Sequence, residues 1–187
     1  MSDGWSQSGL PGVWRRTIAS VPDERGSFSE IWRQSWLEQL PEPSGHALEM
    51  RQANVSRSAA GVLRGLHVHR RQADLWVVLE GRPFVALVDV RPALDGRGPV
   101  QVHTVEASAG DAFFLPEGVA HGFYAPEPLT LVYLVTTEYD GSDELGFAWD
   151  DPSVAIPWPA RDPIVSGRDA AAPPLSELLA TLRDAAP

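Results

Sequence analysis

Histidines are the residues of this chain whose spacing best suggests chemistry. His67 and His69 stand two apart in RGLHVHRRQADLWVVLEG, and His121 lies in GDAFFLPEGVAHGF. Residues two apart on a β-strand point to the same face, so we expect His67 and His69 to face a barrel interior. Imidazoles converging there, with His121 entering from a second hairpin, predict either a metal site or acid–base chemistry. His46 and His103 stand alone and are given no role.

Both histidine segments resemble the two sequence motifs of the cupin superfamily. One is a His-x-His pair followed by an acid and a glycine, and the other is Gly-x5-Pro-x-Gly-x2-His. The matching residues, with aspartate in place of the usual glutamate, are His67, His69, Asp74, Gly81, Gly110, Pro116, Gly118 and His121. The resemblance implies an all-β, cupin-type double-stranded β-helix, or jelly-roll barrel. It says little about the reaction, because one fold hosts many chemistries.

Residues 48–136 predict the strands that such a barrel needs. Short runs rich in Val, Leu and aromatics are separated by Gly, Pro and Asp, which is typical of strands and turns. These runs are VLRGLHVH, DLWVVLEG, PFVALVDVR, PVQVHTVE, DAFFLP and LTLVYLVTT. No long helix intervenes, which favours a barrel or sandwich over an α/β fold. Continuous runs in WVVL and LVYLV predict strands covered on both faces, whereas partial alternation in VALVDV and VQVHTV predicts one wet face.

The segments around these strands predict caps and connections. Residues 28–40 indicate a short strand and a short helix, PEPSG at 41–45 a break, and LDGRG at 94–98 a hairpin-type turn. Residues 173–185 predict a C-terminal helix that packs as a cap on the barrel. Its apolar positions at helical spacing are Leu175, Leu178, Leu179 and Leu182. With no repeat and no long linker, we expect residues 1–187 to form one domain.

Composition excludes several classes of function. The 187 residues carry a net charge of −10, no cysteine and no lysine, since all 15 basic residues are arginine. We therefore expect no nucleic-acid surface, no thiol chemistry, no disulfide and no lysine Schiff base. The start MSDGWSQSGLPG lacks a signal-peptide pattern, and no segment reaches the roughly 18 apolar residues of a membrane span. The expected location is the cytoplasm.

Over residues 11–175 the chain resembles the dTDP-4-dehydrorhamnose 3,5-epimerase family. The resemblance rests on the order and spacing of separate strings: DERGSFSE, RQANVSRSAAGVLRGLH, PEGVAHGF, YLVTTEY, WDDPSVAIPWP and GRDAAAPPL. It implies a cofactor-independent isomerase, a 3,5- or 3-epimerase. Its substrate would be a nucleotide-diphospho-4-keto-6-deoxy sugar, inverted at C3, C5 or both. It also implies a homodimer.

The resemblance assigns the proton-transfer residues. A ketone acidifies the hydrogens on its neighbouring carbons, but an enzyme must supply a base on one face and an acid on the other. By resemblance, His67 is the base, Asp151 in WDDP is its orienting partner and Tyr133 is the acid. A histidine is largely neutral at pH 7, and a carboxylate behind it fixes its tautomer. From the sequence alone, Tyr133 would be an ordinary core aromatic.

The resemblance also assigns substrate-binding residues. Arg64 matches a diphosphate-contacting arginine, and a guanidinium fork suits phosphate oxygens. The RG-x-F-x-E string implies an arm that reaches into the neighbouring site of a dimer. The remaining assignments are Arg25, Phe28 and Glu30 for that arm, Gln52 and Asn54 near the nucleotide, Tyr139 stacked near the base, and His121 as a second-shell or phosphate-side residue.

One position departs from the family pattern. The family has a lysine in a string like QAKL, whereas this chain has QADL and places Asp74 there. A carboxylate would repel the enolate that the lysine stabilises. In a divergent epimerase, Asp74 would be protonated, turned away, or paired with Arg70 or Arg71.

Two other hypotheses follow from this departure. In a metal-dependent cupin enzyme, an isomerase or oxygenase, His67, His69, Asp74 and His121 would bind Mn, Fe, Ni or Zn. A metal-bound His67 could not also abstract a proton. In a non-catalytic sugar-binding cupin, the missing lysine would reflect the loss of catalytic activity. We favour the metal-free epimerase, because a metal cupin would not need the retained set of Arg64, Tyr133 and Asp151.

Overall fold

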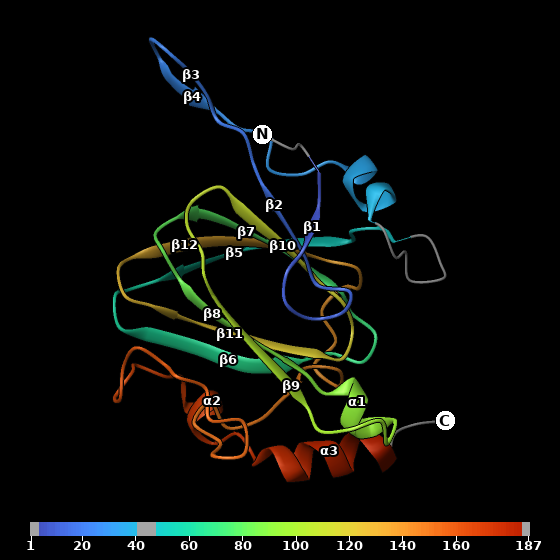
Figure 1. Ribbon diagram of the computed structural model, residues 1–187. Helices are drawn as coiled ribbons and strands as arrows, with labels where there is room; N and C mark the ends of the chain where they lie inside the picture. The colour runs from blue at the N-terminus through green and yellow to red at the C-terminus, as the bar shows by residue number, and fades with distance from the viewer. Residues whose placement is uncertain (1–3, 41–47, 185–187) are drawn as a thin grey trace.

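Two antiparallel sheets face each other in the computed structural model, which describes residues 4–40 and 48–184 (Figure 1). The first has strand order β1-β2-β10-β7-β12-β5 and the second β13-β6-β11-β8-β9. Strands of the first sheet are β1 (Ser6–Gln7), β2 (Trp14–Thr17), β10 (Asp111–Leu115), β7 (Asp74–Glu80), β12 (Leu129–Val135) and β5 (Gln52–Ser58). Strands of the second are β13 (Leu145–Gly146), β6 (Val62–Val68), β11 (Val119–Ala125), β8 (Phe84–Asp89) and β9 (Gln101–Glu106). The predicted all-β, cupin-type jelly-roll barrel is confirmed.

The remaining elements lie around this barrel. A third, two-stranded sheet pairs β3 (Val21–Asp23) with β4 (Gly26–Phe28) and projects from the body (Figure 1). The helices are the 3-10 helix η1 (Gln34–Gln39), α1 (Arg91–Leu94), α2 (Gly167–Ala170) and α3 (Leu175–Asp184). The strand and helix predicted over 28–40 correspond to the end of β4 and to η1. The break predicted at 41–45 and His46 lie outside the described residues.

The central strands β7 and β12 of the six-stranded sheet are covered on both faces, as their continuous apolar runs predict. The prediction of one wet face for VALVDV is wrong, because β8 is buried on both sides. Val85 and Leu87 of β8 join the core between the sheets, whereas Ala86 and Val88 pack outward in the cluster that contains α3. A helix 90 residues later in the chain removes the solvent that the alternation implied.

Helix α3 lies against the outer side of the five-stranded sheet (Figure 1), and the predicted C-terminal cap is confirmed. Leu175, Leu178 and Leu182 are buried there, and Leu179 is partly buried. The hairpin-type turn predicted at 94–98 lies between the antiparallel strands β8 and β9 as expected, and the short helix α1 precedes it in their connection. Among the described residues, no helix is long and apolar enough to cross a membrane.

Candidate active site

A cavity of about 510 Å³ opens between the two sheets. Its wall draws on β5, β7 and β12 from one sheet and on β6 and β11 from the other. Residues 139–144 and 166–169, outside the main strands, also supply side chains. The cavity mixes ionisable side chains with aromatic and apolar ones, which is typical of a small-molecule site.

Two glycines let the cavity wall form beside His67. Gly65 on β6 has φ of +106°, and a Cβ added there would lie 2.7 Å from Gly122 Cα on β11. An added Cβ on Gly122 would likewise lie 2.7 Å from the Arg64 carbonyl oxygen. β6 and β11 can approach this closely only without side chains at these positions. The pairing register then sets His67 opposite His121.

His67 and Asp169 form a hydrogen-bonded pair at the cavity. His67 Nε2 lies 2.8 Å from Asp169 Oδ1, and the His67 side chain is 27% exposed while that of Asp169 is 6% exposed. Burial acts to raise the pKa of Asp169, but hydrogen bonds from His67 and Ser166 and the charge of His67 hold the pKa below its ordinary value. Asp169 is therefore ionised at neutral pH and accepts the Nε2 proton, which leaves the Nδ1 lone pair free to act as a base.

The predicted pairing of His67 with Asp151 is wrong. Asp151 Oδ2 accepts a hydrogen bond of 2.7 Å from the backbone nitrogen of Leu175, the first residue of α3. Its Oδ1 accepts bonds from the nitrogen and Oγ of Ser153. Asp151 is buried and is not among the described residues that line the cavity. The carboxylate in WDDP thus caps a helix, because it satisfies a terminal N–H that α3 itself cannot.

Asp169 is the functional residue that sequence reasoning missed. It belongs to the string GRDAAAPPL, and its backbone nitrogen donates to Ser166 Oγ at 3.0 Å. Ser166 is the N-cap of α2, so the spacing Ser-x-x-Asp was a readable helix-start signal. Nothing in the sequence indicated that this helical turn would lie against β6.

Tyr133 lines the same cavity from the opposite sheet. It lies on β12 of the six-stranded sheet, while His67 lies on β6 of the five-stranded sheet. Burial raises the pKa of Tyr133, and the negative charges of Asp74 and Glu144 raise it further. The phenol is therefore protonated at neutral pH and can donate a proton into the cavity.

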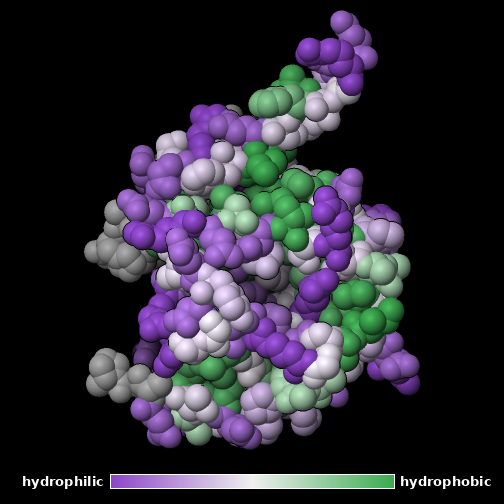
Figure 2. Space-filling view, turned by 180° about the vertical axis from the view of Figure 1, so that it is seen from behind, coloured by the Kyte–Doolittle hydropathy of each residue, from purple (hydrophilic) through white to green (hydrophobic). Residues whose placement is uncertain are grey.

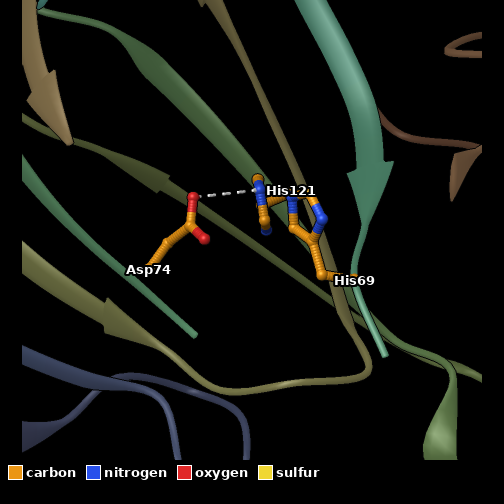
Figure 3. Close-up of side chains that lie close together, drawn as sticks. All are labelled: His69, Asp74 and His121. Atoms are coloured by element: carbon orange, nitrogen blue, oxygen red, sulfur yellow. Dashed lines mark ion pairs between the residues drawn. The ribbon is translucent and has the colours of Figure 1, made fainter. Parts of the chain in front are cut away.

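His69, Asp74 and His121 form a second cluster in the cavity, and Figure 3 shows the three side chains lying close together. Their ligand-type atoms all lie within 4.8 Å of one another, and His121 Nε2 is 3.7 Å from Asp74 Oδ2. Burial lowers the pKa of His121 to about 4, so its ring is neutral at pH 7. Asp74 is itself buried, and its carboxylate accepts hydrogen bonds from Gln72 Nε2 at 2.8 Å and Trp76 Nε1 at 3.3 Å.

Two expectations about Asp74 therefore need correction. Its carboxylate does not pair with Arg70 or Arg71, because these arginines pair with Asp143 and Asp140 at the other side of the loop. The predicted metal-binding set of three histidines and one aspartate is also incomplete. Among the described residues, His69, Asp74 and His121 converge without His67, whose Nε2 bonds Asp169.

Most residues assigned to substrate binding line the cavity: Arg64, Gln52, Asn54, His121 and Tyr139. Arg64 is held by Ser58 Oγ at 3.0 Å and by the Arg57 carbonyl oxygen at 3.2 Å. Gln52 Nε2 donates to Asn54 Oδ1, and Gln52 Oε1 accepts from the Tyr139 nitrogen, each at 2.9 Å. These contacts fix a polar rim beside the cavity.

The three residues assigned to the arm lie elsewhere. Arg25, Phe28 and Glu30 are not among the described residues lining the cavity. Arg25 pairs with Asp23 and Glu30 with Arg33, whereas Phe28 is 72% exposed. Within this chain the projecting hairpin thus contributes nothing to the site.

Comparisons with known proteins identify the family of this chain. Residues 7–177 match the family described as dTDP-4-dehydrorhamnose 3,5-epimerase. The chain is 35% identical to the dTDP-4-dehydrorhamnose 3,5-epimerase of Mycobacterium tuberculosis, covering 92% of this chain and 87% of that protein. It is also 35% identical to the dTDP-4-dehydrorhamnose 3-epimerase of Streptomyces niveus, covering 95% and 84%. The solved 3,5-epimerase of Legionella pneumophila in complex with dTDP-4-keto-L-rhamnose superposes with a TM-score of 0.83 at 32% identity, covering 96% of each chain.

Proposed function

The chain belongs to the dTDP-4-dehydrorhamnose 3,5-epimerase family and is therefore an isomerase, and we propose that His67, Asp169 and Tyr133 carry its reaction. The substrate is a nucleotide-diphospho-4-keto-6-deoxy sugar, of the kind bound by the similar Legionella enzyme. The observation that carries the proposal is one cavity with an Asp-backed imidazole on one sheet and a neutral phenol on the other.

The proton transfers follow from this geometry. His67 takes a proton from the carbon next to the ketone, and the C–H electron pair moves toward the C4 oxygen as an enolate. Asp169 stabilises the imidazolium that forms. The enolate carbon then takes a proton from Tyr133 on the opposite face, which inverts the centre. The His67 imidazolium afterwards loses its extra proton to solvent, and the Tyr133 phenolate regains one from solvent. No step requires a cofactor.

The nucleotide diphosphate is assigned to the polar rim. Arg64 donates to phosphate oxygens, Gln52 and Asn54 contact the nucleotide, and the exposed Tyr139 stacks against the base. The phosphate role is not extended to His121, because its neutral ring faces the carboxylate of Asp74.

The projecting hairpin is assigned to a homodimer. Val21 and Phe28 on β3 and β4 are 62% and 72% exposed. Figure 2 shows hydrophobic atoms along the stem of the hairpin and hydrophilic atoms at its tip. An exposed apolar arm of this kind gains stability when a second copy covers it. Analytical ultracentrifugation tests this assignment, with Phe28→Ser expected to shift the protein toward monomer.

Solvent deuterium incorporation tests the proposed reaction. Protein is incubated in D₂O with dTDP-4-keto-6-deoxyglucose, and NMR follows deuterium at C3 and C5 together with the configuration of each centre. We expect deuterium at the inverted centre or centres. No exchange, under conditions where the Mycobacterium tuberculosis relative exchanges, would contradict the proposal.

The two aspartates assigned by contact should separate in their effects. Asp169→Asn is expected to lower the rate of inversion by roughly 10- to 100-fold, because loss of a carboxylate partner weakens and misorients its histidine. Asp151→Ala is expected to lower the free energy of unfolding by about 1–3 kcal/mol, because the buried Leu175 N–H loses its acceptor. Steady-state rates and urea unfolding of both variants provide the measurement. If folded Asp151→Ala lost as much of its inversion rate as Asp169→Asn does, the assignment of Asp169 as the catalytic partner and Asp151 as a helix cap would be wrong.

The negative charge of Asp74 should be visible in the pH profile. Burial and then Asp74 raise the pKa of Tyr133, so the phenol keeps its proton, and inversion continues, to higher pH than for an ordinary tyrosine. Asp74→Asn removes one of the charges that raise the pKa of Tyr133. We therefore expect the alkaline limb of the rate profile to move to lower pH in chelator-treated protein. Asp140→Asn, which also removes an acid lining the cavity, is the matched control and should leave the limb in place. An unchanged limb in Asp74→Asn would contradict this coupling.

A further inference from the structure

We propose that His69, Asp74 and His121 form a binding site for one divalent transition-metal ion inside the cavity. The two imidazoles and the carboxylate come from three places in the fold, namely the residue directly after β6, the start of β7 and the middle of β11. Figure 3 shows the three side chains lying close together, with a dashed line joining Asp74 to His121. The site excludes His67, which keeps its bond to Asp169.

Hydrogen bonds to the far side of each ring prepare both histidines as ligands. His69 Nδ1 lies 2.9 Å from the Asp143 carbonyl oxygen, and His121 Nδ1 lies 3.0 Å from the Val119 carbonyl oxygen. A carbonyl oxygen can only accept, so each ring carries its proton on Nδ1 and an unshared pair on Nε2. Backbone-fixed tautomers of this kind are the outer support that metal-binding histidines have.

The carboxylate is prepared in the same way. Gln72 and Trp76 hold Asp74 from the side, and its Oδ2 lies 3.7 Å from His121 Nε2. Asp74 is 3% exposed and forms no ion pair with an arginine among the described residues. A buried carboxylate without a cation is costly, and a bound dication offsets that cost.

The dimensions and donor types indicate the class of ion. Metal–ligand bonds near 2.1 Å place neighbouring ligand atoms about 3–4 Å apart, so the His121–Asp74 pair at 3.7 Å already fits. The other separations are at most 4.8 Å and need to close by no more than about 1 Å. Two imidazole nitrogens and one carboxylate oxygen suit Mn, Fe, Co, Ni or Zn rather than Mg or Ca. Three protein ligands leave coordination positions open toward the cavity.

The ion would reverse the charge of this side of the cavity. Asp74 without a metal opposes an anion in the cavity, whereas a dication on the same three ligands attracts one. This consequence for turnover rests on the proposed epimerase function, but metal binding itself does not. The proton-transfer groups His67, Asp169 and Tyr133 remain outside the metal site.

Cobalt binding to the full-length, chelator-stripped protein tests the site. Titration calorimetry and the visible ligand-field absorption of Co²⁺ should show one ion per chain. His69→Gln and Asp74→Asn are each expected to weaken Co²⁺ binding by about 100-fold or more, because each removes a direct ligand. His103→Gln, a half-buried histidine on β9, should bind Co²⁺ like the wild type. Circular dichroism and thermal melting of each variant establish that it is folded.

The outcomes separate this proposal from the epimerase assignment. His67→Asn should retain Co²⁺ affinity while it loses deuterium exchange. No Co²⁺ binding by a wild-type protein that exchanges deuterium would overturn the metal site and leave the function standing. Equal loss of Co²⁺ affinity in His67→Asn and His69→Gln would overturn the three-ligand site, since His67 would then be a ligand.

Discussion

Replacing His67 by asparagine should lower both deuterium exchange and inversion by roughly 10²- to 10⁴-fold, the usual contribution of a general base. Asparagine is too short to reach Asp169 as His67 Nε2 does, but hydrogen bonds from Ser166 and the Gly65 backbone still stabilise the Asp169 carboxylate. The variant should therefore fold. Its loss of activity should appear in kcat, and its affinity for dTDP should stay near that of the wild type. NMR in D₂O and calorimetric titration with dTDP measure the two quantities.

His103→Gln supplies the matched control for His67→Asn. His103 lies on the edge strand β9 and is not among the described residues that line the cavity, so its replacement should leave both rates near those of the wild type. If His67→Asn exchanged deuterium within tenfold of the wild-type rate, another group in the cavity would have to be the base. The assignment of His67 would then be wrong.

The sheets could be predicted from local sequence because the pattern of apolar residues in most strands reflects which faces are buried. β7 contains the continuous apolar run LWVVL and β12 the run LVYLV, and most residues of both runs are buried. β8 shows where this reasoning ends, since its outer face is covered by α3, which lies far along the chain. A pattern within one strand cannot report a cover supplied by a distant helix.

Site residues on strands could be predicted from the sequence, whereas those in the irregular C-terminal segment could not. His67 and Tyr133 could be placed because each lies on a strand within a string that resembles the epimerase family. The aspartate that pairs with His67 could not be predicted from the sequence, because Asp151 and Asp169 both lie in a proline-rich tail without periodicity. Which carboxylate reaches β6 depends on how that tail folds back, and the structure assigns one to a helix cap and the other to the histidine.

The contacts of Asp74 could not be predicted from the sequence either. Its departure from the family lysine was visible in the string QADL, but its neighbours were not. The nearest arginines in sequence, Arg70 and Arg71, turn to acids in the loop at 140–143. Tertiary contacts instead bring Asp74 to His121, which lies 47 positions away in sequence and whose Nε2 is 3.7 Å from Asp74 Oδ2 across the barrel.

Tyr133→Phe should separate the two halves of the reaction. Phenylalanine keeps the aromatic ring on β12 but removes the phenolic proton, so inversion is expected to fall by roughly 10²- to 10⁴-fold. His67 remains on the opposite sheet and can still remove and return a proton on its own face. We therefore expect deuterium to enter substrate that keeps its original configuration, a pattern that His67→Asn cannot give. NMR detects it as exchange without a new epimer, and Tyr124→Phe on β11, outside the cavity lining of the described residues, should behave like the wild type. Equal loss of exchange and inversion in Tyr133→Phe would contradict an acid on the face opposite His67.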